Sequence, residues 1–114
     1  MNPSDINQLM TKAREAQAKM GEIQRELALR RVEGSAGGGM VTAVATGELR
    51  ILKIEIEPGL LASDDREMLQ DLVAAAVNAA LANAQKMVQE EFQRASAGMA
   101  MPNLSELFGS GGSS

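Results

Sequence analysis

The sequence predicts an α+β protein in which two helices accompany a three-stranded antiparallel sheet, in the order α-β-β-β-α. Three observations predict this fold. Residues 6–27 carry apolar or small side chains at helical spacing, residues 32–56 hold short alternating runs separated by glycines, and residues 68–84 return to helical spacing. Because the strand connections are short, neighbouring strands form hairpins and the sheet is antiparallel.

The 114 residues fit a single domain, which we place at residues 1–95. It comprises a projecting N-terminal helix over 1–31, a sheet over 32–57 and a C-terminal helix over 63–95. Residues 96–114 are rich in Gly, Ser, Met and Pro and end in GSGGSS, which predicts a flexible tail.

The first helix is predicted to start near Pro3, because proline is tolerated in a first helical turn. Its apolar or small positions follow alternating steps of three and four residues: Ile6, Leu9, Ala13, Ala16, Met20, Ile23 and Leu27. This spacing is a heptad pattern, as in coiled coils. The apolar stripe is narrow, so we expect much of this helix to be exposed to solvent.

Strands are predicted at residues 31–36, 40–46 and 49–56. The glycines at 37–39 favour a hairpin connection over a phosphate-binding loop, since the GxxxxGK[ST] pattern is absent. In the last strand Leu52, Ile54 and Ile56 form one apolar face, while Leu49 and Ile51 lie on the other. We expect one face of the sheet to carry both helices and the other to contact a second copy of the chain.

The second long helix is predicted to start at Ser63-Asp64-Asp65, where a side-chain oxygen can cap free amide groups. From Met68 the apolar spacing is helical, and alanine occupies many of these positions. Little side-chain bulk means that another element packs very close. We predict that Leu72, Ala76 and Ala80 face the sheet.

Composition excludes the commonest catalytic and metal-binding chemistry. The chain contains neither His nor Cys, so the usual bases, nucleophiles and zinc ligands are missing. The carboxylates of residues 64–71 lack the spacing of a calcium loop and are ordinary for a helix N-terminus. We therefore predict no enzyme activity, cofactor, metal site or small-molecule substrate. No apolar run reaches the roughly 20 residues of a membrane span, and a cytoplasmic location is expected.

Charge is distributed unevenly along the chain. Residues 1–31 hold six basic and four acidic side chains, whereas residues 32–114 hold five basic and eleven acidic ones. A local basic face on the first helix is therefore compatible with an acidic protein. The candidate phosphate contacts, assigned by charge, are Lys12, Arg14, Lys19, Arg25, Arg30 and Arg31. Lys12 and Lys19 occupy the same heptad position and form a stripe beside the apolar seam.

Several segments together resemble the YbaB/EbfC family of bacterial nucleoid-associated proteins. They are PGLL at 58–61 with DLVAAAVNAA at 71–80, Gln8-Leu9-Met10, Gln17-Ala18-Lys19-Met20, Gly47, and Ser96-Ala97-Gly98-Met99. The resemblance covers roughly residues 6–101. It implies a tweezer-shaped homodimer, with helices projecting from a joint β core. It also implies binding to double-stranded DNA with little sequence preference, association with the nucleoid, and effects on DNA conformation and gene expression.

A second interpretation comes from the heptad pattern itself. Two helices beside β hairpins also suit a chaperone-like clamp, similar to prefoldin, or a coiled coil that binds a partner protein without contacting DNA. Titration with duplex DNA, beside an assay of aggregation suppression, separates the two interpretations.

Overall fold

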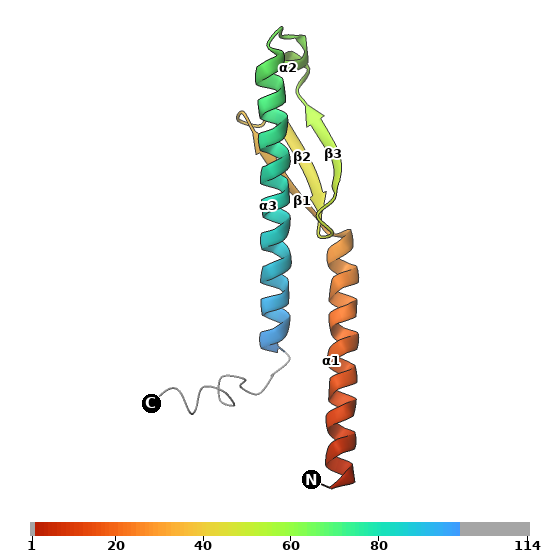
Figure 1. Cartoon of the computed structure of the whole chain (residues 1–114). Helices are drawn as coiled ribbons and strands as arrows, with labels where there is room; N and C mark the ends of the chain where they lie inside the picture. The colour runs from red at the N-terminus through yellow and green to blue at the C-terminus, as the bar shows by residue number, and fades with distance from the viewer. Residues whose placement is uncertain (1, 99–114) are drawn as a thin grey trace, which may run out of the picture. The chain divides into compact units, whose positions relative to one another are not determined.

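The computed structural model describes residues 2–98 and contains six elements (Figure 1). In chain order they are α1 (Pro3–Leu29), β1 (Arg31–Ala36), β2 (Val41–Thr46), β3 (Ile51–Ile56), α2 (Pro58–Ala62) and α3 (Arg66–Gly98). Residues 24–89 form one compact unit, which holds the sheet, α2 and most of α3. Residues 1–23 belong with the end of α3 to a second unit. The predicted α+β class is confirmed.

The sheet is antiparallel, in the order β1-β2-β3. Its central strand, β2, is the most buried, and its two outer strands are edges. Glycines at 37–39, all with left-handed backbone, connect β1 to β2, and Met40 N–H donates to the Gly37 carbonyl at 3.4 Å. The hairpin predicted for this segment is therefore present.

A β-bulge changes which side chains of β3 share a face. Ala45 pairs with Ile51 and the adjacent Val44 pairs with Lys53, so Leu52 is an extra residue in the ladder. The register continues with Ile54 opposite Ala43 and Ile56 opposite Val41. Ile51, Ile54 and Ile56 therefore lie on one face, because paired residues point to the same side of an antiparallel sheet. The assignment of Ile51 to the opposite face was wrong, because it assumed an uninterrupted alternation.

The core lies between this face of the sheet, α2 and α3. Its buried cluster contains Val41, Ala43, Ala45, Leu60, Ala76, Ala80 and Ala84, with Leu72, Ile51 and Ile56 packed against it at partial burial. Ala76 and Ala80 are fully buried. Leu49, Leu52 and Ile54 remain exposed. Among the described residues Val41 is the largest fully buried side chain, so this core is made mostly of alanine.

Close contact between α3 and β1 explains the small residues on both elements. A Cβ atom added to Gly34 would lie 2.1 Å from the Ala80 nitrogen and 2.5 Å from the Ala79 carbonyl carbon. The helix backbone therefore rests directly on the strand, and only glycine fits at this position. Nearby, Asn83 Nδ2 donates to the Glu33 carbonyl oxygen at 2.8 Å and ties the helix to the same strand.

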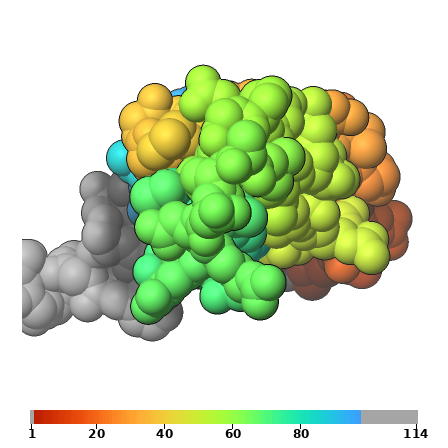
Figure 2. Space-filling model, turned by 90° about the horizontal axis from the view of Figure 1, so that it is seen from above, coloured from red at the N-terminus to blue at the C-terminus, as the bar shows by residue number. Residues whose placement is uncertain are grey.

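The helices contribute unequally to the core. Within residues 2–98 the core cluster contains three alanines of α3 and no residue of α1, and Leu27 is the buried residue of α1. Only Arg30 separates α1 from β1. A short helix that the sequence did not predict, α2, contains PGLL; Pro58 occupies its first turn and Leu60 is buried. Figure 2 shows α2 in green, between the β1–β2 turn and β3.

The second long helix differs from its prediction at both ends. It begins at Arg66, and the Asp65 carboxylate caps it by accepting the Met68 N–H at 2.9 Å. A cap within Ser63-Asp64-Asp65 was predicted, and Asp65 provides it. The helix continues through Gly98, so residues 96–98 of the predicted flexible tail are helical. Residues 99–114, the rest of that tail, lie outside the described part of the chain.

Candidate nucleic-acid interface

The six basic residues predicted from charge are all exposed and lie along α1 and its continuation into β1. Lys12, Arg14 and Lys19 belong to residues 1–23 of the helix, whereas Arg25 and Arg30 follow in residues 24–30 and Arg31 begins β1. The helix begins with Asn2 as its cap, since the Asp5 N–H donates to Asn2 Oδ1 at 3.0 Å. Lys12 and Lys19 lie about 10 Å apart along the helix axis, at 1.5 Å per residue.

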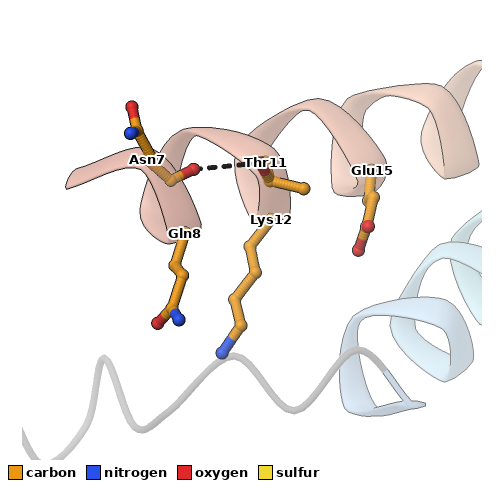
Figure 3. A pocket seen from close by; sticks show the side chains of 5 residues that line it. All are labelled: Asn7, Gln8, Thr11, Lys12 and Glu15. Atoms are coloured by element: carbon orange, nitrogen blue, oxygen red, sulfur yellow. Dashed lines mark hydrogen bonds between the residues drawn. The ribbon is translucent and has the colours of Figure 1, made fainter. Parts of the chain in front are cut away.

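Lys12 and Lys19 lie on the same side of α1, because seven residues are close to two helical turns. Lys12 also lines a shallow hollow on the helix surface with Asn7, Gln8, Thr11 and Glu15 (Figure 3). The Thr11 hydroxyl donates to the Asn7 carbonyl at 2.9 Å. Lys12 and the polar groups on this side of the helix are suited to phosphate contacts, whereas the Glu15 carboxylate opposes them.

The end of α1 is fastened to the turn between β2 and β3. The Gly47 N–H donates to the Leu27 carbonyl at 3.1 Å and to the Arg30 carbonyl at 3.3 Å. A Cβ atom on Gly47 would lie 2.1 Å from the Leu27 oxygen, so glycine allows this approach. We call residues 27–31 and 46–50 the junction. Arg50 lies in the turn of this junction, whose backbone is hydrogen-bonded to the end of α1.

The turn within the junction is held by its own hydrogen bonds. Thr46 N–H donates to the Arg50 carbonyl at 3.0 Å, and Leu49 N–H donates to the Thr46 carbonyl at 2.9 Å. Leu49 has a φ of 64° and is, within residues 2–98, the one non-glycine residue with left-handed backbone. For leucine this conformation is strained, at a cost of about 1–2 kcal/mol.

The ion pairs that hold exposed charges near the sheet are weak. Arg50 Nη1 lies 3.8 Å from Glu48 Oε2, and both side chains are more than half exposed. Lys53 and Glu55 make a shorter pair, of 2.8 Å, also in solvent. Exposed pairs of this kind contribute about 0–1 kcal/mol, so a phosphate group can replace the carboxylate as the partner of Arg50.

The acidic residues that follow β3 form a contrasting region. Residues 57–71 hold five acidic side chains against Arg66 alone, a net charge of −4, and all six are exposed. The predicted capping role explains part of this cluster, through Asp65. Within residues 2–98 no group of acidic side chains is arranged to hold a metal ion. Nor, in the same range, is any helix apolar and long enough to span a membrane.

The family model that matches this sequence describes the YbaB/EbfC DNA-binding family, and it covers residues 1–99. The chain belongs to the YbaB/EbfC DNA-binding family. The resemblance stated from the sequence motifs is thereby confirmed. This is a family of nucleoid-associated, DNA-binding proteins of bacteria rather than a family of enzymes.

Curated relatives agree with this membership. A nucleoid-associated protein of Desulfotalea psychrophila is 45% identical over 100 residues, which cover 88% of this chain and 94% of the relative. One from Thermoanaerobacter pseudethanolicus is 43% identical, with coverage of 88% and 90%. Among solved structures, an uncharacterized protein of Helicobacter pylori is similar with a TM-score of 0.57 at 21% identity, over 87% of this chain and 97% of that one. This last likeness supports the fold.

Charge along the sequence predicts six candidate residues on α1 and β1 and does not include Arg50, which lies in the turn that is hydrogen-bonded to the end of α1. Its position in a short turn carried no signal, because the turn meets α1 only through hydrogen bonds between residues about 20 apart in the chain. A weak clue did exist: Gly47 lies between a threonine and a glutamate in a tight hairpin, where a close backbone approach is common.

Proposed function

We propose that this protein binds double-stranded DNA as a homodimer on the nucleoid, with little dependence on sequence, and that it thereby alters DNA conformation and gene expression. The observation that carries the proposal is the row of six exposed basic side chains on α1 and the first residue of β1. Membership of a DNA-binding family supports it. We propose no catalytic role, because the sequence lacks His and Cys.

Contacts to DNA phosphates explain binding that does not depend on the base sequence of the DNA. Lysine and arginine neutralise phosphates and release condensed counterions, which makes the affinity fall steeply as salt rises. Base readout requires an element fitted to a groove with side chains aimed at base edges. The exposed face of α1 that includes Lys12 and Lys19 instead alternates basic with acidic residues, among them Glu15 and Glu22. Moderate, salt-sensitive affinity follows.

The test reverses the charge of the Lys12–Lys19 stripe. Replacing both residues by Glu changes four side chains in a dimer, and both lie on the exposed side of α1, so folding is preserved. We expect binding to drop by at least about tenfold at roughly 50 mM salt, and the slope of log K against log salt to become shallower by about 0.9 for each phosphate that the variant no longer neutralises. Anisotropy titrations on two unrelated duplexes measure both quantities.

A matched control separates local contacts from net charge. Arg66→Glu with Lys86→Glu changes the formal charge by the same amount, on exposed positions of α3. This variant should bind more tightly than the Lys12–Lys19 variant. Equal binding by wild type and a folded Lys12–Lys19 variant would remove the stripe from the mechanism. No binding by wild type at roughly 50 mM salt would refute DNA binding itself.

The homodimer is proposed on two features of residues 24–89. The core consists mostly of alanine, and a unit of this size buries only about 60% of its unfolded surface, which is marginal for a monomer. At the same time β3 is an edge strand whose Leu52 and Ile54 side chains are 48% and 40% exposed. Apolar edge strands readily pair with another chain. We propose that β3 contributes to the contact between copies through its edge and these two exposed side chains.

Concentration dependence tests the dimer. Because dimerisation stabilises only the folded state, the melting temperature should rise with protein concentration. Ile54→Lys should shift the protein toward monomer in sedimentation experiments, whereas Leu61→Lys, at an exposed leucine of α2, should not. A folded wild-type monomer at micromolar concentration would contradict the proposal.

A partner-binding clamp is the second candidate, and one observation favours it. Ile6, Leu9 and Met10 follow i, i+3, i+4 spacing on α1 and are all exposed. An unpaired apolar stripe of this kind suits a helical partner. Suppression of aggregation by a protein that fails to bind DNA would favour this function.

A further inference from the structure

Leu29 is the most exposed large apolar side chain among the described residues. It is the last residue of α1, and 81% of its surface is accessible to solvent. A single exposed leucine is common on protein surfaces and by itself indicates nothing. This leucine, however, lies within the junction, where the chain is held by hydrogen bonds from the Gly47 N–H to the Leu27 and Arg30 carbonyls.

The basic residues near Leu29 are all arginines. Arg25, Arg30 and Arg31 lie within six residues of one another around Leu29, and the junction adds Arg50. Residues 1–23 instead carry two lysines and one arginine. Arginine is the residue that DNA-binding proteins insert into a narrow minor groove, where the negative potential is strongest. An apolar side chain beside arginines is therefore the composition of a minor-groove contact rather than of a simple phosphate contact.

Leu49 adds a second exposed leucine to the junction. Its side chain is 44% exposed although its backbone has a φ of 64°, a conformation that glycine would adopt without strain. Residues with strained backbone are concentrated at functional sites in proteins. Two exposed leucines thus lie in the junction, which also carries arginines.

We propose that Leu29 inserts between base pairs from the minor groove and bends the DNA, with Leu49 contacting the same groove and the arginines of the junction contacting its walls. Proteins that bend DNA in this way use leucine, among other apolar side chains, to unstack a base step. This inference rests on the proposed binding of duplex DNA. It goes beyond that function by assigning the bend to a particular side chain.

Charge complementarity favours DNA over other occupants of the junction. Residues 25–31 carry Arg25, Arg30 and Arg31 against Glu26, and the turn carries Arg50 against Glu48. A second copy would have to bring its acidic residues 57–71 to this surface, whereas DNA presents phosphate groups along its whole length. An opened base step also provides an apolar space for the Leu29 side chain.

The experiment measures binding and bending separately. A duplex of about 30 base pairs is much shorter than the persistence length of about 150 base pairs, so it is nearly straight until a protein bends it. Energy transfer between dyes on its two ends reports the bend, and 2-aminopurine within the duplex reports unstacking. Anisotropy on the same duplex reports affinity. Wild type should raise both the energy transfer and the 2-aminopurine fluorescence at saturation.

Leu29→Gln removes the apolar side chain and keeps a residue that favours helix. We expect its Kd to change by less than about tenfold, since phosphate contacts supply most of the affinity, while the bend and the unstacking signal are lost at saturation. Leu29→Phe should retain both signals. Leu61→Gln is the matched control, because Leu61 is 58% exposed but lies in α2, beside the acidic residues 57–71. It should behave as wild type.

Two results would overturn the inference while leaving DNA binding intact: a bound wild type that produces neither signal, or a Leu29→Gln variant that bends and unstacks DNA like wild type. A shift of Leu29→Gln to monomer in sedimentation would also overturn it, by placing Leu29 in a contact between copies. Failure of wild type to bind the duplex at all is a different outcome, which refutes the proposed function.

Discussion

Replacing Gly34 by alanine is the sharpest test of how the core is built. The new Cβ atom would lie 2.1 Å from the Ala80 nitrogen and 2.6 Å from the Ala80 Cα. Ordinary contact begins at 3.4 Å, so α3 would have to retreat from β1 by 3.4 − 2.1 = 1.3 Å. These are backbone atoms of a helix, and no change of side-chain rotamer can relieve the contact.

The cost of this retreat follows from the size of the core. A gap of 0.5–1 Å already forfeits about a quarter to a half of the dispersion energy of the atoms it separates. The retreat would open such a gap between the alanines of α3 and those of β2. Overpacking costs about 1–3 kcal/mol, and we place Gly34→Ala at the upper end, about 3 kcal/mol. For a domain of this size the melting temperature should fall by about 12–24 °C.

Circular dichroism during thermal and urea unfolding, at one fixed protein concentration, measures this change. Gly59→Ala is the control, because nothing lies within 4 Å of the added Cβ and the residue is in helix α2. It should be neutral or stabilising by up to about 1 kcal/mol. If Gly34→Ala is within about 1 kcal/mol of wild type, α3 does not rest on β1 as closely as the structure describes.

Two further substitutions test the buried helix face and the strained turn. Ala76→Leu or Ala80→Leu should lower the free energy of unfolding by about 1–3 kcal/mol through overpacking. Ala97→Leu, at an exposed position near the end of α3, should change it little. Equal melting temperatures of all three variants in a thermal scan would contradict the assigned buried face. Leu49→Gly should stabilise the fold by about 0.5–1 kcal/mol, because relief of left-handed strain at Leu49 exceeds the added chain entropy of glycine. A loss of stability in urea unfolding would show instead that the Leu49 side chain holds the turn.

Much of this fold is visible in the sequence because its signals are local. Heptad spacing, alternating runs and a cap at Asp65 each act within a few residues, so they indicate the elements without knowledge of their neighbours. Alanines at 76 and 80 also predicted close packing, since small side chains at a core position leave room only for another backbone. The exposure of the basic residues of α1 could also be predicted from the sequence, because a narrow apolar stripe leaves most of a helix surface in contact with solvent.

Other features depend on contacts between distant segments, and only the tertiary structure decided them. Leu52 is a bulge because β2 and β3 pair out of step at Val44 and Ala45, and this single extra residue moves Ile51 to the core face. The burial of Leu27 near the end of α1, and the hydrogen bond from the Gly47 N–H to its carbonyl, depend likewise on where the chain turns. The alternation of apolar residues and the distribution of charge are properties of a single segment. The register of two strands and the contact between α1 and the β2–β3 turn depend on the free energy with which two segments pack against each other.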